Sequence, residues 1–138
     1  MMNNPSTSEE WMTVARERGA DAEAMLPSRA DSIGPAYMVG YAIECAIKGY
    51  LQQQGISRPP SGREGHHLRG IWKQAGFCLR DLNDPVGTKS FFIEHWSTDF
   101  RYQTACPNMP NSDELVKAAK DIVRWVQAQI KRQKRRRT

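Results

Sequence analysis

The stretch from Tyr37 to Leu51, YMVGYAIECAIKGYL, decides the fold. Plotted on a helical wheel, at about 100° per residue, this segment is apolar on every side except for one narrow stripe. The stripe spans an arc of about 60° and consists of Tyr37, Tyr41, Glu44 and Lys48. A helix that is apolar on its other sides must be buried. Charged residues within it need either a charged or hydrogen-bonding partner or a functional role. We therefore expect a central helix here, and we look for function along its stripe.

The central helix has clear boundaries. Proline suits a first helical turn and glycine suits the position after the last one, so the helix should begin between Ala30 and Pro35 and end at Gly55. Two interior glycines, Gly40 and Gly49, are either simply tolerated or indicate that another backbone packs closely against the helix.

Apolar residues at helical spacing predict a helix before this segment and another at the end of the chain. The first follows a capping box formed by Ser6 and Glu9 and ends near Pro27. The last is capped by Asn111 or Ser112 and carries a single apolar stripe. That stripe consists of Leu115, Ala119, Ile122, Val126 and Ile130.

Two shorter helices are expected between the central and last ones. One runs from His66 to Ala75. The other contains aromatic residues at positions i, i+4 and i+8, a pattern more typical of a core than of a surface that stacks nucleotide bases. These aromatic residues are Phe92, Trp96 and Phe100. The same helix closes on the sequence DFRY, which places Arg101 and Tyr102 at its end.

No segment alternates in the manner of a strand, and there is no internal repeat, so we expect an all-α fold. The architecture should be an antiparallel up-and-down bundle of about five helices. We expect a flexible N-terminus over residues 1–8, a helical domain over 9–130 and a basic tail over 131–138.

The positive charge is concentrated in the tail. The formal net charge is +5, and the tail carries six cations, which leaves the rest of the chain at −1. The six are Lys131, Arg132, Lys134, Arg135, Arg136 and Arg137. Such a tail either binds RNA, DNA or an acidic partner by neutralising charge, or is a solvated helix end whose cations favour the helix dipole.

Cysteine usage and the N-terminal sequence bear on the compartment. Cys45, Cys78 and Cys106 are odd in number and widely spaced, which favours reduced thiols and a cytoplasmic protein. The N-terminus lacks the basic start and apolar core of a secretory signal. Residues 33–51 approach the length of a membrane span, but Glu44 and Lys48 near their centre argue against a membrane helix.

Few residues have the pattern of a reaction centre. His66 and His67 open a helix, where a histidine more often caps than catalyses, and His95 adjoins Trp96 in an aromatic helix. Arg101 can either pair with the stripe across the bundle or bind a phosphate through two parallel hydrogen bonds. No metal-ligand spacing and no glycine-rich phosphate loop is present, so we expect no metal and no cofactor.

Three local patterns, in this order and spacing, resemble the HEPN domain family. They are GYAIECAIK at residues 40–48, GHHL at residues 65–68, and Arg101-Tyr102. The resemblance covers roughly residues 20–130. It implies a prokaryotic helical bundle that commonly dimerises, and it implies a minimal nucleotidyltransferase as a partner. The family includes ribonucleases of toxin–antitoxin and phage-defence systems.

The ribonuclease members carry an arginine, then four to six residues, then a histidine. After Arg101, the corresponding positions hold Cys106, Pro107 and Asn108, and no other arginine precedes a histidine at this spacing. The resemblance therefore implies a non-catalytic module that binds a nucleotide, RNA or a protein partner. Its ligand or interface residues would be Tyr37, Tyr41, Glu44, Lys48, Arg101 and Tyr102.

Two alternatives remain. One is a divergent, metal-independent endoribonuclease toxin that uses His66 or His67 with Arg101. The other is a purely structural bundle that dimerises and binds its nucleotidyltransferase only.

Overall fold

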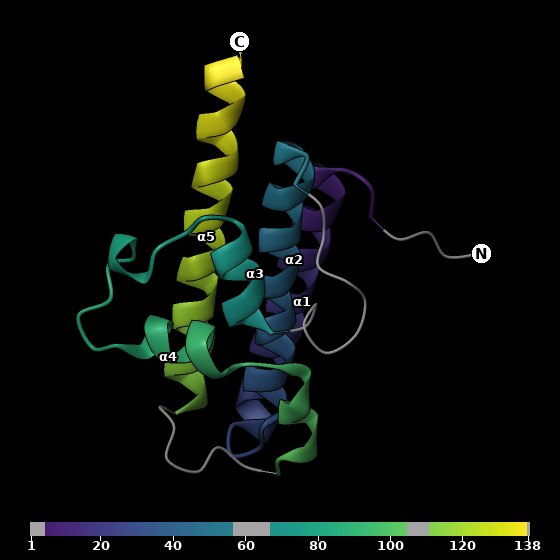
Figure 1. The fold of residues 1–138 in the computed structure, drawn as a ribbon. Coiled ribbons are helices and arrows are strands. Elements are labelled where there is room, and N and C mark those ends of the chain that lie inside the picture. The colour runs from purple at the N-terminus through teal and green to yellow at the C-terminus, as the bar shows by residue number, and fades with distance from the viewer. Residues whose placement is uncertain (1–4, 57–66, 105–110, 138) are drawn as a thin grey trace.

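The computed structural model describes residues 5–56, 67–104 and 111–137. Within these ranges the chain forms helices and no strand, which confirms the predicted all-α bundle of about five helices (Figure 1). The elements are α1 (Ser8–Arg29), α2 (Gly34–Gln54), α3 (Leu68–Gln74), η2 (Leu79–Asp81), α4 (Thr88–His95), η3 (Thr98–Tyr102) and α5 (Ser112–Arg137), where η marks a 3₁₀ helix.

Helix α2 is the centre of the bundle, as its apolar surface predicts. It contacts α1, α5, α3 and η3, and most of its side chains are buried. Pro35 lies in its first turn, and Gly55 ends it in the left-handed conformation, with φ of 68°. Both ends therefore agree with the sequence prediction.

The two interior glycines of α2 meet different neighbours. A Cβ atom at Gly49 would lie 3.1 Å from Trp11 Cβ and 3.3 Å from the carbonyl oxygen of Ser8, so the start of α1 packs closely there, which is one of the two alternatives that the sequence left open. At Gly40 the close neighbour is the indole of Trp96, not a backbone. Glycine is needed at Gly40 because a side chain would occupy the space of that ring.

The capping box of helix α1 lies one residue later than the predicted one. The capping residue is Thr7, whose Oγ1 accepts a hydrogen bond from the amide of Glu10 at 3.1 Å. Glu10 completes the box by accepting from the amide of Ser6 at 3.4 Å and from its hydroxyl at 2.9 Å. The helix also continues through Pro27 to Arg29. The prediction of Ser6 and Glu9 as the box was therefore wrong by one position.

The fourth helix is shorter than its aromatic spacing predicts. Helix α4 ends at His95, and Trp96 is already extended, with ψ of 135°. The Ser97 hydroxyl accepts from the amide of Asp99 at 3.2 Å, and this local bond starts η3 instead of continuing α4. Arg101 and Tyr102 therefore lie on a separate 3₁₀ helix. The core prediction holds for Phe92 and Trp96, which are buried, while Phe100 is partly buried against the core.

Helix α5 buries the predicted apolar stripe from Leu115 to Ile130. Asn111 is its cap, because its Oδ1 accepts from the amide of Glu114 at 2.9 Å. Ser112 instead donates its hydroxyl to the carbonyl oxygen of Ala30 at 2.6 Å, which ties the start of α5 to the end of α1. Figure 1 shows the C-terminal turns of α5 projecting beyond the neighbouring ends of α1 and α2.

Candidate functional site

The accessible part of the α2 stripe is a pair of tyrosines. Tyr37 and Tyr41 are one helical turn apart, so their side chains lie on the same face. Their hydroxyls form a hydrogen bond of 2.8 Å, and their rings meet edge to face with centroids 5.2 Å apart. Both side chains are half-buried. The pair therefore presents two linked phenols at the edge of the core.

Trp96 fixes the orientation of the two tyrosines. Its ring stacks on Tyr37, with centroids 6.3 Å apart, and meets Tyr41 edge to face at 5.2 Å. Trp96 is buried against Gly40, and its Nε1 has no hydrogen-bond acceptor among the described residues. Packing therefore positions this indole, and the absence of a side chain at Gly40 makes that packing possible.

The element η3 brings a cation to this aromatic cluster. Arg101 Nη2 donates to the hydroxyl of Tyr102 at 2.8 Å, and its guanidinium carbon lies 4.8 Å from the centroid of the Tyr102 ring. Arg101 is exposed, and Tyr102 is 70% exposed. No ion pair joins Arg101 to a carboxylate within the described ranges. An arginine stacked on an exposed ring, with its charge unmatched, is suited to an anionic ligand.

The electrostatics of the cluster keep the Tyr41 phenol neutral, because they raise its pKa. Burial raises the pKa of Tyr41 above its usual value, and the hydrogen bond with Tyr37 and the charge of Glu44 act in the same direction. The Arg101 charge opposes these effects on the pKa of Tyr41. At neutral pH Tyr41 is therefore a hydrogen-bonding group and not a base.

The other part of the stripe lies inside the protein. Lys48 Nζ is 2.9 Å from Glu44 Oε2, and their side chains are only 12% and 5% exposed. Lys48 also lies over the ring of Trp11, at 5.7 Å from its centroid. Glu44 thus pairs within its own helix and not with Arg101, which settles the pairing that the sequence left open. The stripe that is continuous on the helical wheel therefore has an accessible half, Tyr37 and Tyr41, and a buried half, Glu44 and Lys48.

Of the two candidate catalytic histidines, the structure describes only His67, which is not joined to Arg101. His67 precedes α3, and its backbone forms an isolated bridge with Ser97. No hydrogen bond or ion pair connects it to Arg101 in the part of the chain that the structure describes. His66 lies outside the described residues, as do the three positions at which the ribonuclease histidine would fall.

The basic tail begins at the opposite end of α2 from Arg101. Helix α5 continues through residues 131–137, and just before them Gln53 Nε2 donates to the carbonyl oxygen of Ile130 at 3.0 Å. Tyr37 and Gln53 are about 24 Å apart along α2, at 1.5 Å per residue. The cations at 131, 132 and 134–136 are exposed, and Lys134 pairs with Glu9 at 2.6 Å. Arg101 and the tail are therefore separate sites.

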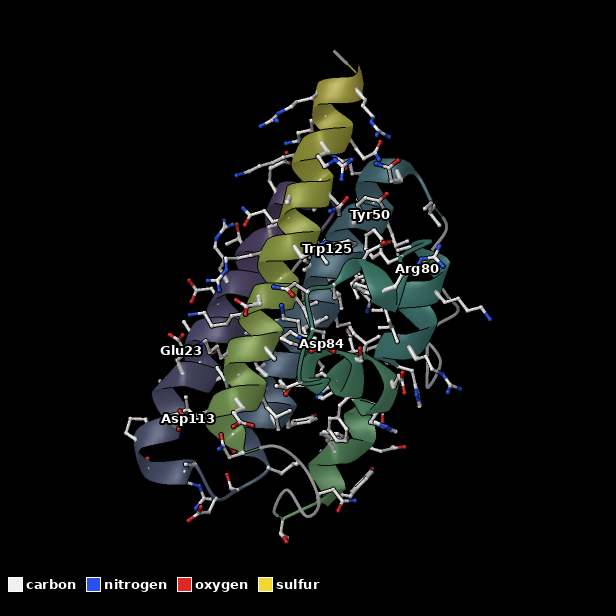
Figure 2. The ribbon with its side chains drawn as sticks, turned by 90° about the vertical axis from the view of Figure 1, so that its left-hand side faces the viewer. Glu23, Tyr50, Arg80, Asp84, Asp113 and Trp125 are labelled. Atoms are coloured by element: carbon white, nitrogen blue, oxygen red, sulfur yellow. The ribbon has the colours of Figure 1, made fainter. Side chains whose placement is uncertain are left out.

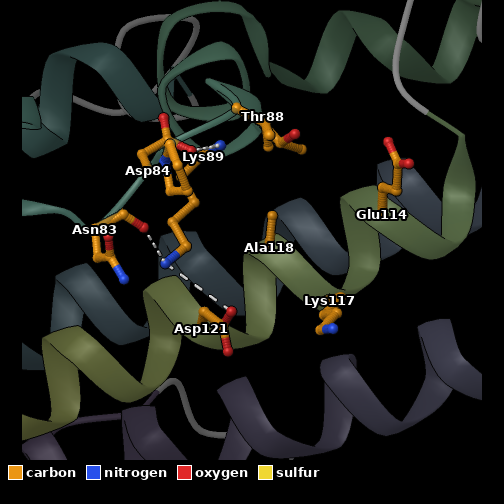
Figure 3. Close-up of a pocket in the computed structure, with 10 residues that line it drawn as sticks. Asn83, Asp84, Thr88, Lys89, Glu114, Lys117, Ala118 and Asp121 are labelled. Carbon is orange, nitrogen blue, oxygen red and sulfur yellow. Dashed lines mark hydrogen bonds and ion pairs between the residues drawn. The ribbon is translucent and has the colours of Figure 1, made fainter.

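A hollow that the sequence did not indicate lies between α5 and the loop before α4 (Figure 3). It measures about 570 Å³. Several of its polar groups already have structural partners. Asp84 caps α4 by accepting from the amides of Lys89 and Ser90 at 3.0 and 2.9 Å, and Lys89 Nζ donates to the carbonyl oxygen of Asn83 at 2.7 Å. The Asp-Pro-x-Gly sequence of this loop is typical of a turn and gives no indication of a cavity.

The described residues contain no group of three or more His, Cys, Asp and Glu side chains that is suited to hold a metal ion. None of the described helices is long and apolar enough to cross a membrane.

The sequence model of the HEPN domain family matches residues 8–131. No curated protein and no solved structure matched the chain. The family match extends further towards the N-terminus than the local patterns do, because it includes all of α1.

Proposed function

The chain belongs to the HEPN domain family, and on that premise we propose that it is a non-catalytic module that binds RNA or a nucleotide. The family assignment by itself supports a role related to nucleotides or RNA. The observation that carries the proposal is Arg101, an exposed guanidinium that stacks on Tyr102 and has no acidic partner within the described ranges. Guanidinium groups of this kind bind phosphate through paired, charge-assisted hydrogen bonds.

The surroundings of Arg101 suit a nucleotide better than a bare phosphate. Tyr102 exposes most of its ring, and a base can stack on such a surface without regard to its identity. The linked hydroxyls of Tyr37 and Tyr41 offer polar contacts beside the cation. Neutral phenols next to one positive charge complement a ligand with one anionic group and several hydrogen-bonding groups.

The same geometry argues against RNA cleavage. Metal-independent cleavage needs groups that give and take a proton near neutral pH. The pKa of Tyr41 is raised by burial, and the hydrogen bond to Tyr102 raises that of Arg101, so neither group changes charge near neutrality. The histidine of the ribonuclease motif is also missing after Arg101.

The basic end of α5 supplies a second, non-specific contact for a longer RNA. A mononucleotide at Arg101 cannot reach the tail, whereas about seven nucleotides, at about 3.4 Å each, cover the length of about 24 Å between Tyr37 and Gln53 along α2. The proposed module therefore binds short ligands through Arg101 alone and longer strands through both sites. We also propose that it forms a homodimer and works with a minimal nucleotidyltransferase in a toxin–antitoxin or defence system.

The proposal is tested by measuring fluorescence anisotropy with two labelled probes, a mononucleotide and a single-stranded RNA that spans both sites. Arg101→Gln should weaken binding of both probes by about tenfold, the value of one charge-assisted contact. Arg80→Gln, which removes an exposed arginine on η2, is the matched control and should change either affinity less than about twofold. Truncation after Ile130 should weaken the RNA only, and should reduce its salt dependence.

Two outcomes contradict the proposal. One is an equal effect of Arg101→Gln and Arg80→Gln on both probes, which would mean that Arg101 is not the binding site. The other is metal-independent cleavage of the RNA that His67→Ala abolishes, which would establish the ribonuclease alternative. Purified protein that binds a nucleotidyltransferase but neither probe would instead support the structural alternative.

A further inference from the structure

A furrow lined by residues of α1 and α5 runs between these two helices, which lie on the side of the molecule that Figure 2 turns towards the viewer. The two helices are antiparallel, and polar contacts join them at both ends and between. These contacts are Ser112–Ala30, Lys120–Glu23 and Lys134–Glu9. Their register shows that α1 and α5 stay side by side along nearly the whole of α1.

Three hollows, of about 320, 310 and 180 Å³, follow one another along this furrow. The first two share Glu23, Lys120 and Arg124 in their walls. The last two share Arg16 and Gln127. Because neighbouring hollows have walls in common, they form one continuous groove and not three separate pockets.

The floor of the groove is apolar, and its middle is lined by small residues. Ala15, Gly19 and Ala42 form the central part, and a Cβ atom built at Gly19 has no neighbour within 4 Å. Towards the two ends the floor consists of larger aliphatic side chains. These are Met12 and Ile130 at one end, and Leu26 and Val116 at the other. No aromatic side chain lines any of the three hollows.

One wall of the groove is a row of cations on α5. The residues that line it are spaced alternately three and four apart, so they form one straight edge of the helix. They are Lys117, Lys120, Arg124, Gln127, Lys131 and Lys134. Three cations of the groove, Arg16, Lys117 and Lys131, have no carboxylate partner in the described part of the chain. The groove therefore carries an excess of positive charge over an apolar floor.

We propose that this groove binds an acidic amphipathic helix of a partner protein. A helix laid in a groove buries its apolar face in the floor and places the residues beside that face against the walls. Acidic residues spaced three and four apart on such a helix would meet the cation row in register. Glu9 and Glu23 of α1 already bind Lys134 and Lys120 of this row. The acidic residues of the partner helix would therefore meet Arg16, Lys117 and Lys131.

The length and chemistry of the groove favour a helix over a nucleic acid. From Lys117 to Lys134 the row extends about 26 Å, which about 18 helical residues span. Single-stranded nucleic acids are held by aromatic side chains on which their bases stack, and this groove has none. The proposal is independent of the Arg101 site, which lies on η3, but it shares Lys131 and Lys134 with the basic tail.

The test uses the full chain and a labelled synthetic peptide of about 18 residues, with leucines on one helical face and glutamates beside them. A scrambled peptide of the same composition is the ligand control. We expect the amphipathic peptide to bind at least about tenfold more tightly than the scrambled one, with affinity falling as salt is added. Gly19→Leu fills the floor and should abolish this preference, while Arg16→Glu should weaken the peptide by about tenfold.

Gly19→Leu should fold at least as well as the wild type, because leucine favours a helix more than glycine and a Cβ atom at this position has no neighbour within 4 Å. Arg80→Glu reverses an exposed charge outside the groove and should leave peptide binding unchanged. The proposal is overturned if the two peptides bind alike or not at all. It is also overturned if Gly19→Leu abolishes binding of a single-stranded RNA, or dissociates a homodimer in sedimentation, because the groove would then hold RNA or a second copy.

Discussion

The two halves of the α2 stripe have the same spacing but lie in different environments. Tyr37 and Tyr41 are four residues apart and share a hydrogen bond of 2.8 Å, and Glu44 and Lys48 are four residues apart and share one of 2.9 Å. The tyrosines lie half-buried near the exposed Arg101, while the charge pair is covered by α1 through Trp11. Helical spacing decides which side chains meet, and the element packed over them decides whether they face a ligand or the core.

We therefore expect substitutions in the two halves to have different effects on the free energy of unfolding, although the halves look alike on a helical wheel. The buried half should be sensitive to loss of either charge, because a charge that stays buried without its partner is costly. Substitutions in the accessible half should weaken nucleotide binding. They should lower the free energy of unfolding only by the contribution of one ordinary hydrogen bond.

The largest effect is expected from Glu44→Ala, which leaves Lys48 without its carboxylate in a largely buried position. Its free energy of unfolding, measured by urea denaturation, should fall by about 3 kcal/mol. Tyr37→Phe, which removes the hydrogen bond of the accessible half, should cost only about 1 kcal/mol. The double variant Glu44→Leu/Lys48→Met should recover most of the loss, because it removes both charges and keeps the volume. Equal losses for Glu44→Ala and Tyr37→Phe would show that the two halves do not differ as described.

Gly40→Ala is expected to have the next largest effect. A Cβ atom there would lie 2.0 Å from Trp96 Cε2 and Nε1, so the indole that positions both tyrosines has to move. We expect a loss of about 1–3 kcal/mol in the free energy of unfolding, together with weaker nucleotide binding at Arg101. Gly19→Ala is the matched control and should be stabilising by about 0.5–1 kcal/mol, since nothing lies within 4 Å of its Cβ position. A neutral Gly40→Ala would mean that Trp96 does not fix the cluster.

The fold could be predicted from the sequence because long helices repeat their signal many times. The apolar stripe of α5 and the apolar surface of α2 each extend over several turns, so a few polar residues do not obscure them. The break between α4 and η3 could not be predicted in the same way. One hydroxyl, that of Ser97, decides it by bonding to the amide of Asp99, while the aromatic spacing continues across the break.

The candidate site was only partly predictable for a related reason. The wheel placed Tyr37, Tyr41, Glu44 and Lys48 on one stripe, but it contains no information about which element covers each half. Trp96 was recognised as core, although its role in orienting the tyrosines depends on its contact with Gly40. The groove between α1 and α5 was missed because its walls belong to segments about 100 residues apart, which only the antiparallel register brings together.

The smallest predicted effect is on the pH dependence of stability, which should differ between Cys45, beside the buried half, and Tyr41, in the accessible half. Burial raises the pKa of the Cys45 thiol to about 12, with the neighbouring Glu44 charge acting in the same direction. An unfolded thiol loses its proton near pH 8.5, so from about pH 9 upward the unfolded chain binds fewer protons than the folded one. Stability is therefore fully present below that pH and is lost as the pH rises towards 12, by up to about 1.4 kcal/mol per pH unit. The raised pKa of Tyr41 adds to the loss only above about pH 10, where an unfolded tyrosine begins to ionise.

Between about pH 9 and 10 the loss should thus come from the Cys45 thiol, beside the buried half, and not from Tyr41. Urea denaturation of the wild type across this interval should show a decrease of about 1 kcal/mol, and Cys45→Ala should remove most of it because no thiol is left to ionise. Tyr41→Phe is the matched variant in the accessible half and should leave the decrease below pH 10 unchanged while reducing the one above it. If Cys45→Ala loses as much stability as the wild type between these pH values, the thiol is not held neutral by burial beside Glu44.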